Sequence, residues 1–414
     1  MDTRFSRRTL LAGAAALAAG SAARAESFDP LLEILQNENQ AEWSDGFDSL
    51  SRKKQVSDFY PTLSDNSVAN IENSLREYAG IVERGGWQVV PETRRLRLGA
   101  RSANVQALRA RLAVSGDLDP ALAESDVFDS YVDAAVRNFQ ARHGMAVDGI
   151  IGSLTISALN IPANVRFRQL QTNYERLKDV PKTKGNRFVM VNIPAAAIET
   201  VEGGRIHSRH TAVVGKIDRQ TPILESAIHE VNFNPYWTVP VSIIRKDLIP
   251  LMQEQPNYLT EYRIRIFSPG GDEIAPEAID WFSDEAVNYR FRQDPGDFNS
   301  LGQMRINFQN PHAVYLHDTP DKNLFGKEVR FHSSGCVRVQ NVREFVQWLL
   351  KETPGWSRRN IDQTIKSGER TDADISNAVP LLMTYVTAWG TPTGVTHFRD
   401  DVYNIDGIGP VALR

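Results

Sequence analysis

The hydrophobic pattern of this chain changes once, near residue 181, and that change limits the folds open to it. Before the change, apolar residues recur at helical spacing, as over residues 68–82. After a polar boundary at residues 181–186, short β runs follow one another, beginning with residues 188–193 and 210–214 and ending with a strand predicted over residues 379–388. The sequence therefore predicts a multi-domain α+β chain, helical in its first part and β-rich in its second. The helical stripe consists of Ile71, Leu75, Tyr78 and Val82.

Residues 96–162 have the pattern of a compact three-helix unit. Ser102 stands where one helix N-cap is expected, either Asp129 or Ser130 stands where a second is expected, and a last short helix is predicted over residues 154–159. The helical spacing favours a core position for Phe139 rather than a ligand contact. The residues expected to face inward are Val105, Leu108, Leu112, Val132, Val136 and Phe139.

The only cysteine, Cys336, lies in a polar Ser-Ser-Gly-Cys sequence that is unusual for a buried filler residue. Gly335 has no β-carbon, so a substrate carbonyl could approach the backbone N–H groups of residues 335 and 336. His317 ends a short apolar segment 336 − 317 = 19 residues earlier, and an imidazole close to a thiol raises its thiolate fraction. The alternative is a buried, unreactive cysteine, which is common for a lone thiol.

The first 25 residues are typical of an export signal. Arg7-Arg8 precedes an Ala/Leu-rich run that ends in a small-residue cleavage pattern at Ala25, which predicts Glu26 as the mature start. The alternative is a membrane anchor, but the apolar run over residues 10–23 is shorter than the ~20 residues that span a bilayer. A single cysteine forms no internal disulfide, so export favours a reactive role for Cys336.

Residues 314–341 resemble the active-site motif of the L,D-transpeptidases, the YkuD-type catalytic domain, in which a His precedes Ser-x-Gly-Cys-x-Arg and an Asn. Ser334 stands where the commoner version has a histidine, as in the large multi-domain Gram-negative subgroup. Residues 136–152 are similar to a three-helix peptidoglycan-binding module. The motif residues here are His317, Ser333, Gly335, Cys336, Arg338 and Asn341.

The resemblance implies roles for residues around the thiol. Cys336 is the expected nucleophile, His317 the base and then the acid, and the main-chain carbonyl of Asp318 the group that orients the imidazole. The N–H groups of Gly335 and Cys336 are expected to polarise the substrate carbonyl. Substrate contacts are expected from Tyr315, Ser333, Ser334, Arg338, Asn341 and Trp237, although packing inside the sheet is an equal alternative for Trp237.

The function that the resemblance implies is a periplasmic L,D-transpeptidase. It would act on peptidoglycan stem peptides, form 3→3 cross-links and be acylated by carbapenems, with glycan as a further partner. An L,D-carboxypeptidase or cell-wall hydrolase using the same cysteine, and a non-catalytic wall-binding scaffold, remain alternatives. No metal or cofactor is expected, because the chain lacks a His-Glu-x-x-His motif, a P-loop and a dinucleotide fingerprint.

Charge argues against a nucleic-acid partner, since the formal net charge is −4 and no basic block occurs. After signal cleavage no membrane span is expected. We expect residues 1–25 to be a twin-arginine-type signal and residues 26–95 a helical scaffold. The peptidoglycan-binding module, a linking helix and the catalytic domain are then expected over residues 96–162, 163–185 and 186–408. A polar insertion at about residues 256–300 is expected to cap the cleft and to include Trp281, Arg290, Arg292 and Gln293.

Overall fold

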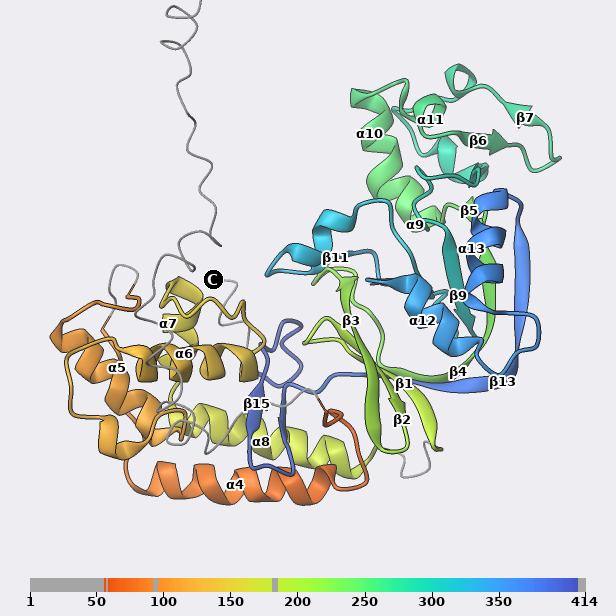
Figure 1. Cartoon of the computed structure of the whole chain (residues 1–414). Helices are drawn as coiled ribbons and strands as arrows, with labels where there is room; N and C mark the ends of the chain where they lie inside the picture. The colour runs from red at the N-terminus through yellow and green to blue at the C-terminus, as the bar shows by residue number, and fades with distance from the viewer. Residues whose placement is uncertain (1–55, 57–58, 92–95, 181–184, 409–414) are drawn as a thin grey trace, which may run out of the picture. The chain divides into compact units, whose positions relative to one another are not determined.

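The computed structural model describes residues 56, 59–91, 96–180 and 185–408 (Figure 1). The predicted signal at residues 1–25 lies outside these residues. Within the described part of the chain, no helix is both long and apolar enough to cross a membrane.

The three-helix unit predicted over residues 96–162 has an apolar core of its own. All six residues predicted to face inward are fully buried, which confirms the helical assignment and the core position of Phe139. The side chain of Asp129 caps its helix by accepting the Val132 N–H at 3.1 Å. Ser102 occupies the predicted N-cap position without a side-chain cap bond. The elements are α5 (Ala103–Val114), η3 (Pro120–Leu122), α6 (Ser130–Arg142) and α7 (Ser153–Leu159).

One buried ion pair stabilises this unit. Arg142 donates to both carboxylate oxygens of Asp117, at 2.7 and 2.5 Å, and the two side chains are only 5% and 1% exposed. Ser115 and Asn138 donate to the same carboxylate. The free-energy cost of desolvating the two charges is thus offset by the hydrogen bonds that the Asp117 carboxylate accepts.

A second core joins two long helices to the outside of the β domain. Helix α4 (Ser67–Glu83) packs on α8 (Ala163–Lys178), and both contact the hairpin of β14 (Ala388–Gly390) and β15 (Thr396–Phe398). Gly390 is required there, since a β-carbon would lie 2.4 Å from the Asn70 carbonyl oxygen.

The predicted stripe on α4 and the predicted linking helix both appear in this core. Ile71 and Tyr78 are fully buried, whereas Leu75 and Val82 are only half-buried at its margin. The linking helix expected within residues 163–185 is α8, which begins at Ala163 and ends at Lys178.

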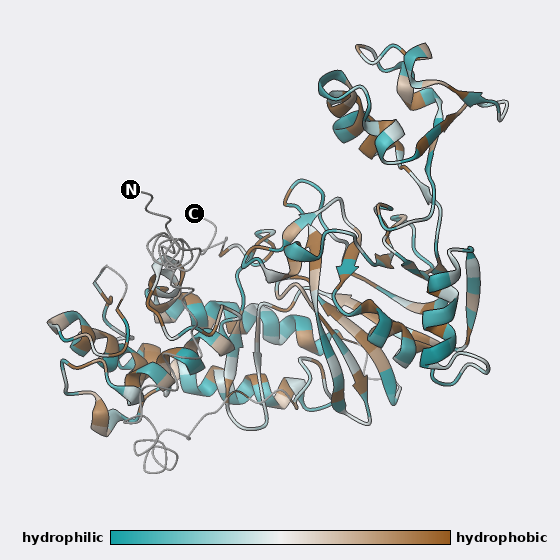
Figure 2. Cartoon of the chain, turned by 45° about the horizontal axis from the view of Figure 1, so that its top comes forward, coloured by the Kyte–Doolittle hydropathy of each residue, from teal (hydrophilic) through white to brown (hydrophobic). Residues whose placement is uncertain are grey.

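The β-rich part is a closed barrel. A nine-stranded sheet runs in the order β11-β3-β12-β10-β9-β4-β13-β1-β2, and the additional β2–β3 pairing closes all of it except β11. Most neighbours are antiparallel, while β1–β13, β10–β12 and β11–β3 are parallel. Figure 2 shows hydrophobic and hydrophilic residues interleaved along these strands, as expected for one face toward a core.

The barrel strands have the following bounds: β1 (Arg187–Asn192), β2 (Ala197–Glu202), β3 (Arg205–Gly215), β4 (Leu224–Phe233), β9 (Met304–Phe308), β10 (Leu316–His317), β12 (Val337–Val339) and β13 (Thr371–Thr384). The appended strand is β11 (Phe331–Ser333). Helices α12 (Val342–Leu349) and α13 (Arg358–Ser367) contribute apolar residues to the barrel core, and η7 (Lys322–Gly326) lies between β10 and β11.

The strand predicted over residues 379–388 is displaced. The observed strand, β13, begins at Thr371 and ends at Thr384. Its first half is polar, and its pairing with β4 shifts register between Asp374 and Val379. This irregularity hides the alternation that would have identified residues 371–378 as a strand.

A separate subdomain interrupts the barrel between two adjacent strands. β4 and β9 are antiparallel neighbours, and residues 234–303 between them contain a four-stranded sheet with its own apolar core. The sequence predicted an irregular insertion only from residue 256, but the sheet begins at Trp237. The strands are β5 (Trp237–Thr238), β6 (Ile264–Phe267), β7 (Glu273–Ile274) and β8 (Arg290–Gln293).

The helices of this subdomain are short. Because its strands span two to four residues, too few for a period of two to be recognised, the sequence pattern reads as loop. The helices are α9 (Val241–Ile243), η4 (Ile244–Leu248), α10 (Ile249–Glu254), α11 (Tyr258–Glu261), η5 (Pro276–Ala278) and η6 (Glu285–Asn288).

Asp117→Ala is expected to destabilise the helical unit by about 3–5 kcal/mol, because it leaves Arg142 buried without its counter-charge. Amide hydrogen exchange of α5 and α6 measures the change locally. The matched control is Asp126→Ala, which removes an ion pair to Arg101 whose side chains are 68% and 46% exposed. This control should cost at most about 1 kcal/mol. Equal effects of the two substitutions would contradict the role assigned to the buried pair.

Candidate active site

His317 lies in a row of three basic side chains across neighbouring strands of the barrel. In the strand register it stands opposite Arg305 of β9 on one side and Arg338 of β12 on the other. Directly opposed residues share a face of the sheet, so both guanidinium groups lie near the imidazole. The Nε atoms of Arg305 and Arg338 are buried and have no hydrogen-bond partner among the described residues.

This setting keeps the imidazole neutral. Burial, followed by the charge of Arg338, lowers the pKa of His317 to about 3, and Arg305 and Lys322 act in the same direction. Nδ1 lies 2.5 Å from the carbonyl oxygen of Asp318. A neutral ring donates from the nitrogen that faces a carbonyl, so the proton is on Nδ1 and the lone pair is on Nε2.

The segment of residues 334–336, here called the cysteine loop, connects β11 to β12. Its conformation depends on one glycine. Gly335 has φ +114°, a conformation that L side chains rarely adopt. A β-carbon at this position would meet its neighbours no closer than 3.5 Å, so backbone conformation, rather than space, requires glycine. The Ser333 hydroxyl braces the turn by accepting the Gly335 N–H at 3.2 Å and donating to the Cys336 carbonyl at 2.5 Å.

The Cys336 thiol is partly exposed and protonated at rest. Burial raises its pKa above the ordinary value, while hydrogen bonds from Tyr315 and the charges of Arg305 and Arg338 oppose that shift without cancelling it. Burial and the neighbouring Cys336 also raise the pKa of the Tyr315 phenol. The sequence predicted a partly ionised thiol beside its base. The pKa shifts instead indicate a neutral thiol and a neutral imidazole.

A cavity of about 420 Å³ brings most of the predicted site together. One wall comes from β10 and the cysteine loop, and another comes from the inserted subdomain through Pro240, Ser242, Ile243 and Asp247. Trp237 lines this cavity and also packs against the core of the inserted subdomain, and its contact with substrate stays a prediction. The predicted residues that line the cavity are Trp237, Tyr315, His317, Ser333, Ser334, Cys336 and Arg338.

Three predicted residues lie outside this lining. Gly335 is buried, and its N–H is already bonded to Ser333. The Asp318 side chain and Asn341 line a different cavity of about 700 Å³. Asn341 also adopts a left-handed conformation as the N-cap residue of α12, which accounts for an asparagine there without a substrate contact.

Several lining residues were not predicted from the sequence. Lys216 and Asp247 come from segments far from the motif, and no local pattern marks them. His312 and His332 also line the cavity, while Arg305 reaches the site through its place beside His317. The alternating burial of β9, in which Met304, Ile306 and Phe308 point inward, is the signal that could have placed Arg305 on the opposite face.

The cysteine loop is also connected to the inserted subdomain. Arg219 donates to the Ser334 hydroxyl at 3.0 Å and forms an ion pair with Asp247, with a second bond of 3.0 Å. Ser334 is therefore held by the loop after β3. Among the described residues, no cluster of three or more His, Cys, Asp or Glu side chains is suited to a metal ion.

Comparison with known families agrees with this geometry. Residues 186–356 match the L,D-transpeptidase catalytic domain (YkuD), and residues 101–159 match the "Putative peptidoglycan binding domain". A Haemophilus influenzae protein named "Putative L,D-transpeptidase" is 35% identical over 240 residues, which are 58% of this chain and 48% of that protein. The chain thus spans about half the length of this relative.

Two further similarities are more limited. An N-acetylmuramoyl-L-alanine amidase, CwlM, of Mycobacterium tuberculosis is 42% identical over 72 residues, 16% of this chain and 18% of that protein. The crystal structure of an L,D-transpeptidase from Xylanimonas cellulosilytica is 15% identical and covers 71% of this chain and 99% of that one. Its TM-score is 0.24, which is too low to support the assignment.

Alkylation of Cys336 by iodoacetamide is expected to accelerate steadily with pH and to reach half its maximum above the ~8.5 of an ordinary cysteine. The reason is that burial raises the thiol pKa while the imidazole stays neutral down to about pH 3. Rates measured by intact mass from about pH 5 to 10 test this expectation. His317→Asn is the control and should leave the acid part of the profile unchanged. A fast plateau below about pH 7 that His317→Asn abolishes would instead indicate a thiolate–imidazolium pair.

Proposed function

Because this chain belongs to the proteins that carry the YkuD-type L,D-transpeptidase catalytic domain, we propose that it forms 3→3 cross-links in peptidoglycan through a thioester on Cys336. The observation that carries the proposal is one cavity lined by a partly exposed thiol and by an imidazole whose Nδ1 is fixed on a carbonyl. The peptidoglycan-binding match supports a polymeric cell-wall substrate. The stem peptide, its glycan and the periplasmic location belong to this proposal.

In the first half-reaction, the Cys336 sulfur attacks the carbonyl of the third stem residue, a meso-diaminopimelate, as Nε2 of His317 takes the thiol proton. A neutral base suits this step, since Nε2 offers a free lone pair at physiological pH. The tetrahedral intermediate then collapses. Its C–N bond breaks, His317 returns the proton to the leaving amine, and D-alanine departs from a thioester.

In the second half-reaction, the side-chain amine of a neighbouring stem attacks the thioester. His317 takes a proton from that amine and returns it to the departing sulfur, which restores the thiol and leaves an amide cross-link. Arg338 lines the cavity, and Arg305 stands on the other side of His317 in the same row. Their positive charges suit the carboxylates of diaminopimelate and D-alanine. They also disfavour a long-lived imidazolium, so the proton is passed on rapidly.

Two alternatives to transpeptidation remain: an enzyme that transfers the acyl group to water, and a protein without catalytic activity. Water as acceptor would make the protein an L,D-carboxypeptidase or a hydrolase that releases wall-anchored protein. A wall-binding scaffold would have no acyl-enzyme at all. The presence of His317 and Cys336 in one cavity favours an enzyme over a scaffold.

Cys336→Ala is expected to abolish the reaction, since no other described residue supplies a thiol. Purified protein with disaccharide-tetrapeptide should yield 3→3 dimers and free D-alanine by mass spectrometry, and with a carbapenem it should gain one adduct. In Cys336→Ala, the yields of 3→3 dimers, of D-alanine and of the carbapenem adduct should each fall at least about 10³-fold. Ser367→Ala, an exposed change of similar size at the end of α13, is the control.

The products separate the alternatives. Tripeptides without dimers would identify a carboxypeptidase, and release of a wall-anchored protein would identify that hydrolase. Cross-linking and labelling that persist in Cys336→Ala would refute the proposed nucleophile.

A further inference from the structure

Thr221, in the loop between β3 and β4, contacts the cysteine loop from inside the molecule. Its side chain is only 2% exposed, and its hydroxyl accepts the Gly215 N–H at 2.8 Å. The same hydroxyl donates its single proton to the Gly335 carbonyl at 2.9 Å. Both hydrogen-bonding functions of this buried group are therefore used, and one of them holds the residue before the nucleophile.

The bond to the Gly335 carbonyl fixes the direction of the next N–H. Gly335 C=O and Cys336 N–H belong to the same trans peptide, in which the two groups point in opposite directions. Since Thr221 holds the carbonyl toward the buried side, the Cys336 N–H points away from it, on the side where Cys336 lines the cavity. The Gly335 N–H is bonded to Ser333, which leaves the Cys336 N–H as the backbone donor of this turn for a substrate oxyanion.

Thr221 is itself held by a tyrosine from the C-terminal segment. The Tyr403 hydroxyl donates to the Gly215 carbonyl at 2.6 Å and accepts the Thr221 N–H at 3.2 Å. Gly215 allows no larger residue, because a β-carbon would lie 2.2 Å from the Arg219 carbonyl oxygen. The two hydroxyl groups and this glycine thus fix the loop after β3.

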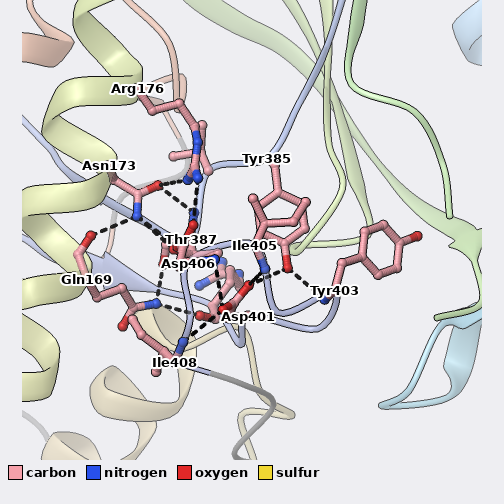
Figure 3. A network of polar contacts seen from close by, with 12 residues as sticks. Gln169, Asn173, Arg176, Tyr385, Thr387, Asp401, Tyr403, Ile405, Asp406 and Ile408 are labelled. Carbon is pink, nitrogen blue, oxygen red and sulfur yellow. Dashed lines mark hydrogen bonds and ion pairs between the residues drawn. The ribbon is translucent and has the colours of Figure 1, made fainter.

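Tyr403 is anchored in turn at its backbone. Its N–H donates to the Tyr385 hydroxyl at 2.8 Å, and that hydroxyl donates to Asp401 at 2.8 Å. Figure 3 shows the Tyr403 ring pointing away from the polar contacts around Asp401, and its hydroxyl is hydrogen-bonded to Gly215 at the end of β3. Asp401 also accepts the N–H groups of Ile405, Asp406 and Ile408.

We propose that Thr221 is a positioning residue that orients the Cys336 N–H as the oxyanion donor, and that Tyr403 holds Thr221 in place. The proposal rests on the acyl-transfer function proposed above. It predicts a selective defect, because attack on a carbonyl develops an oxyanion whereas alkylation of the thiol does not. Alkylation forms an S–C bond, expels iodide and releases the thiol proton to solvent.

Thr221→Val removes the hydroxyl and keeps the shape of the side chain. Carbapenem acylation of Cys336, followed by intact mass, should slow by about 100-fold, which is the loss expected for a misplaced catalytic group. Iodoacetamide alkylation of the same sulfur should stay within about two-fold of the parent protein. Thr221→Ser keeps the hydroxyl and should restore acylation to within about three-fold.

Each outcome of this comparison decides between explanations. Parent protein that takes no carbapenem would refute the proposed function, whereas normal acylation of Thr221→Val would overturn the role of Thr221 alone. An equal loss of acylation and alkylation would show a general disturbance of the thiol and also overturn it. If Thr221→Val fails to fold, Tyr403→Phe removes only the hydroxyl beneath Thr221 and should give the same selective loss. An unselective effect of Tyr403→Phe would then contradict the proposal.

Discussion

The site depends on an imidazole whose pKa is lowered first by burial and then by the charges of two neighbouring arginines, so that it stays neutral. His317 stands opposite Arg305 and Arg338 in the strand register, so the fold itself sets its electrostatics. A ring in this position cannot stabilise a resting thiolate by forming an ion pair with it. It can still accept a proton during attack, when negative charge moves from sulfur onto the substrate oxygen. In the proposed reaction, His317 is therefore a base that acts only when a substrate carbonyl is present.

The same constraint limits the reactivity of the thiol. A sulfur that stays protonated at rest is a weaker target for oxidants than a thiolate, since the thiolate is the reactive species. Partial exposure lets a substrate reach Cys336, and burial of the rest of the side chain keeps its pKa high. In the proposed reaction, selectivity for carbonyl substrates comes from the backbone around the sulfur, which accepts hydrogen bonds from Ser333 and Thr221.

The sequence predicted the features that depend on local spacing. Helical periodicity identified α4, α5, α6 and α8, and the short Ser-Ser-Gly-Cys sequence identified the cysteine loop. The structure adds what depends on register and on distant segments. Arg305 and Thr221 reach the site through pairing of strands and through a loop whose contacts no local pattern records. The extent of the inserted subdomain was wrong at its start, because strands of two residues carry no recognisable alternation.

The place of the inserted subdomain in the chain explains how it comes to line the cavity of Cys336 and His317. It leaves the barrel after β4 and returns at β9, the strand that carries Arg305 beside His317. Arg219 adds a second connection, from Ser334 in the cysteine loop to Asp247 in the subdomain. Two guanidinium nitrogens of Arg219 donate to the two oxygens of Asp247, and the Arg219 side chain is only 13% exposed, so this pair is stronger than an isolated surface ion pair. The subdomain is therefore held beside the cysteine loop by this contact as well as by its two connections to the barrel.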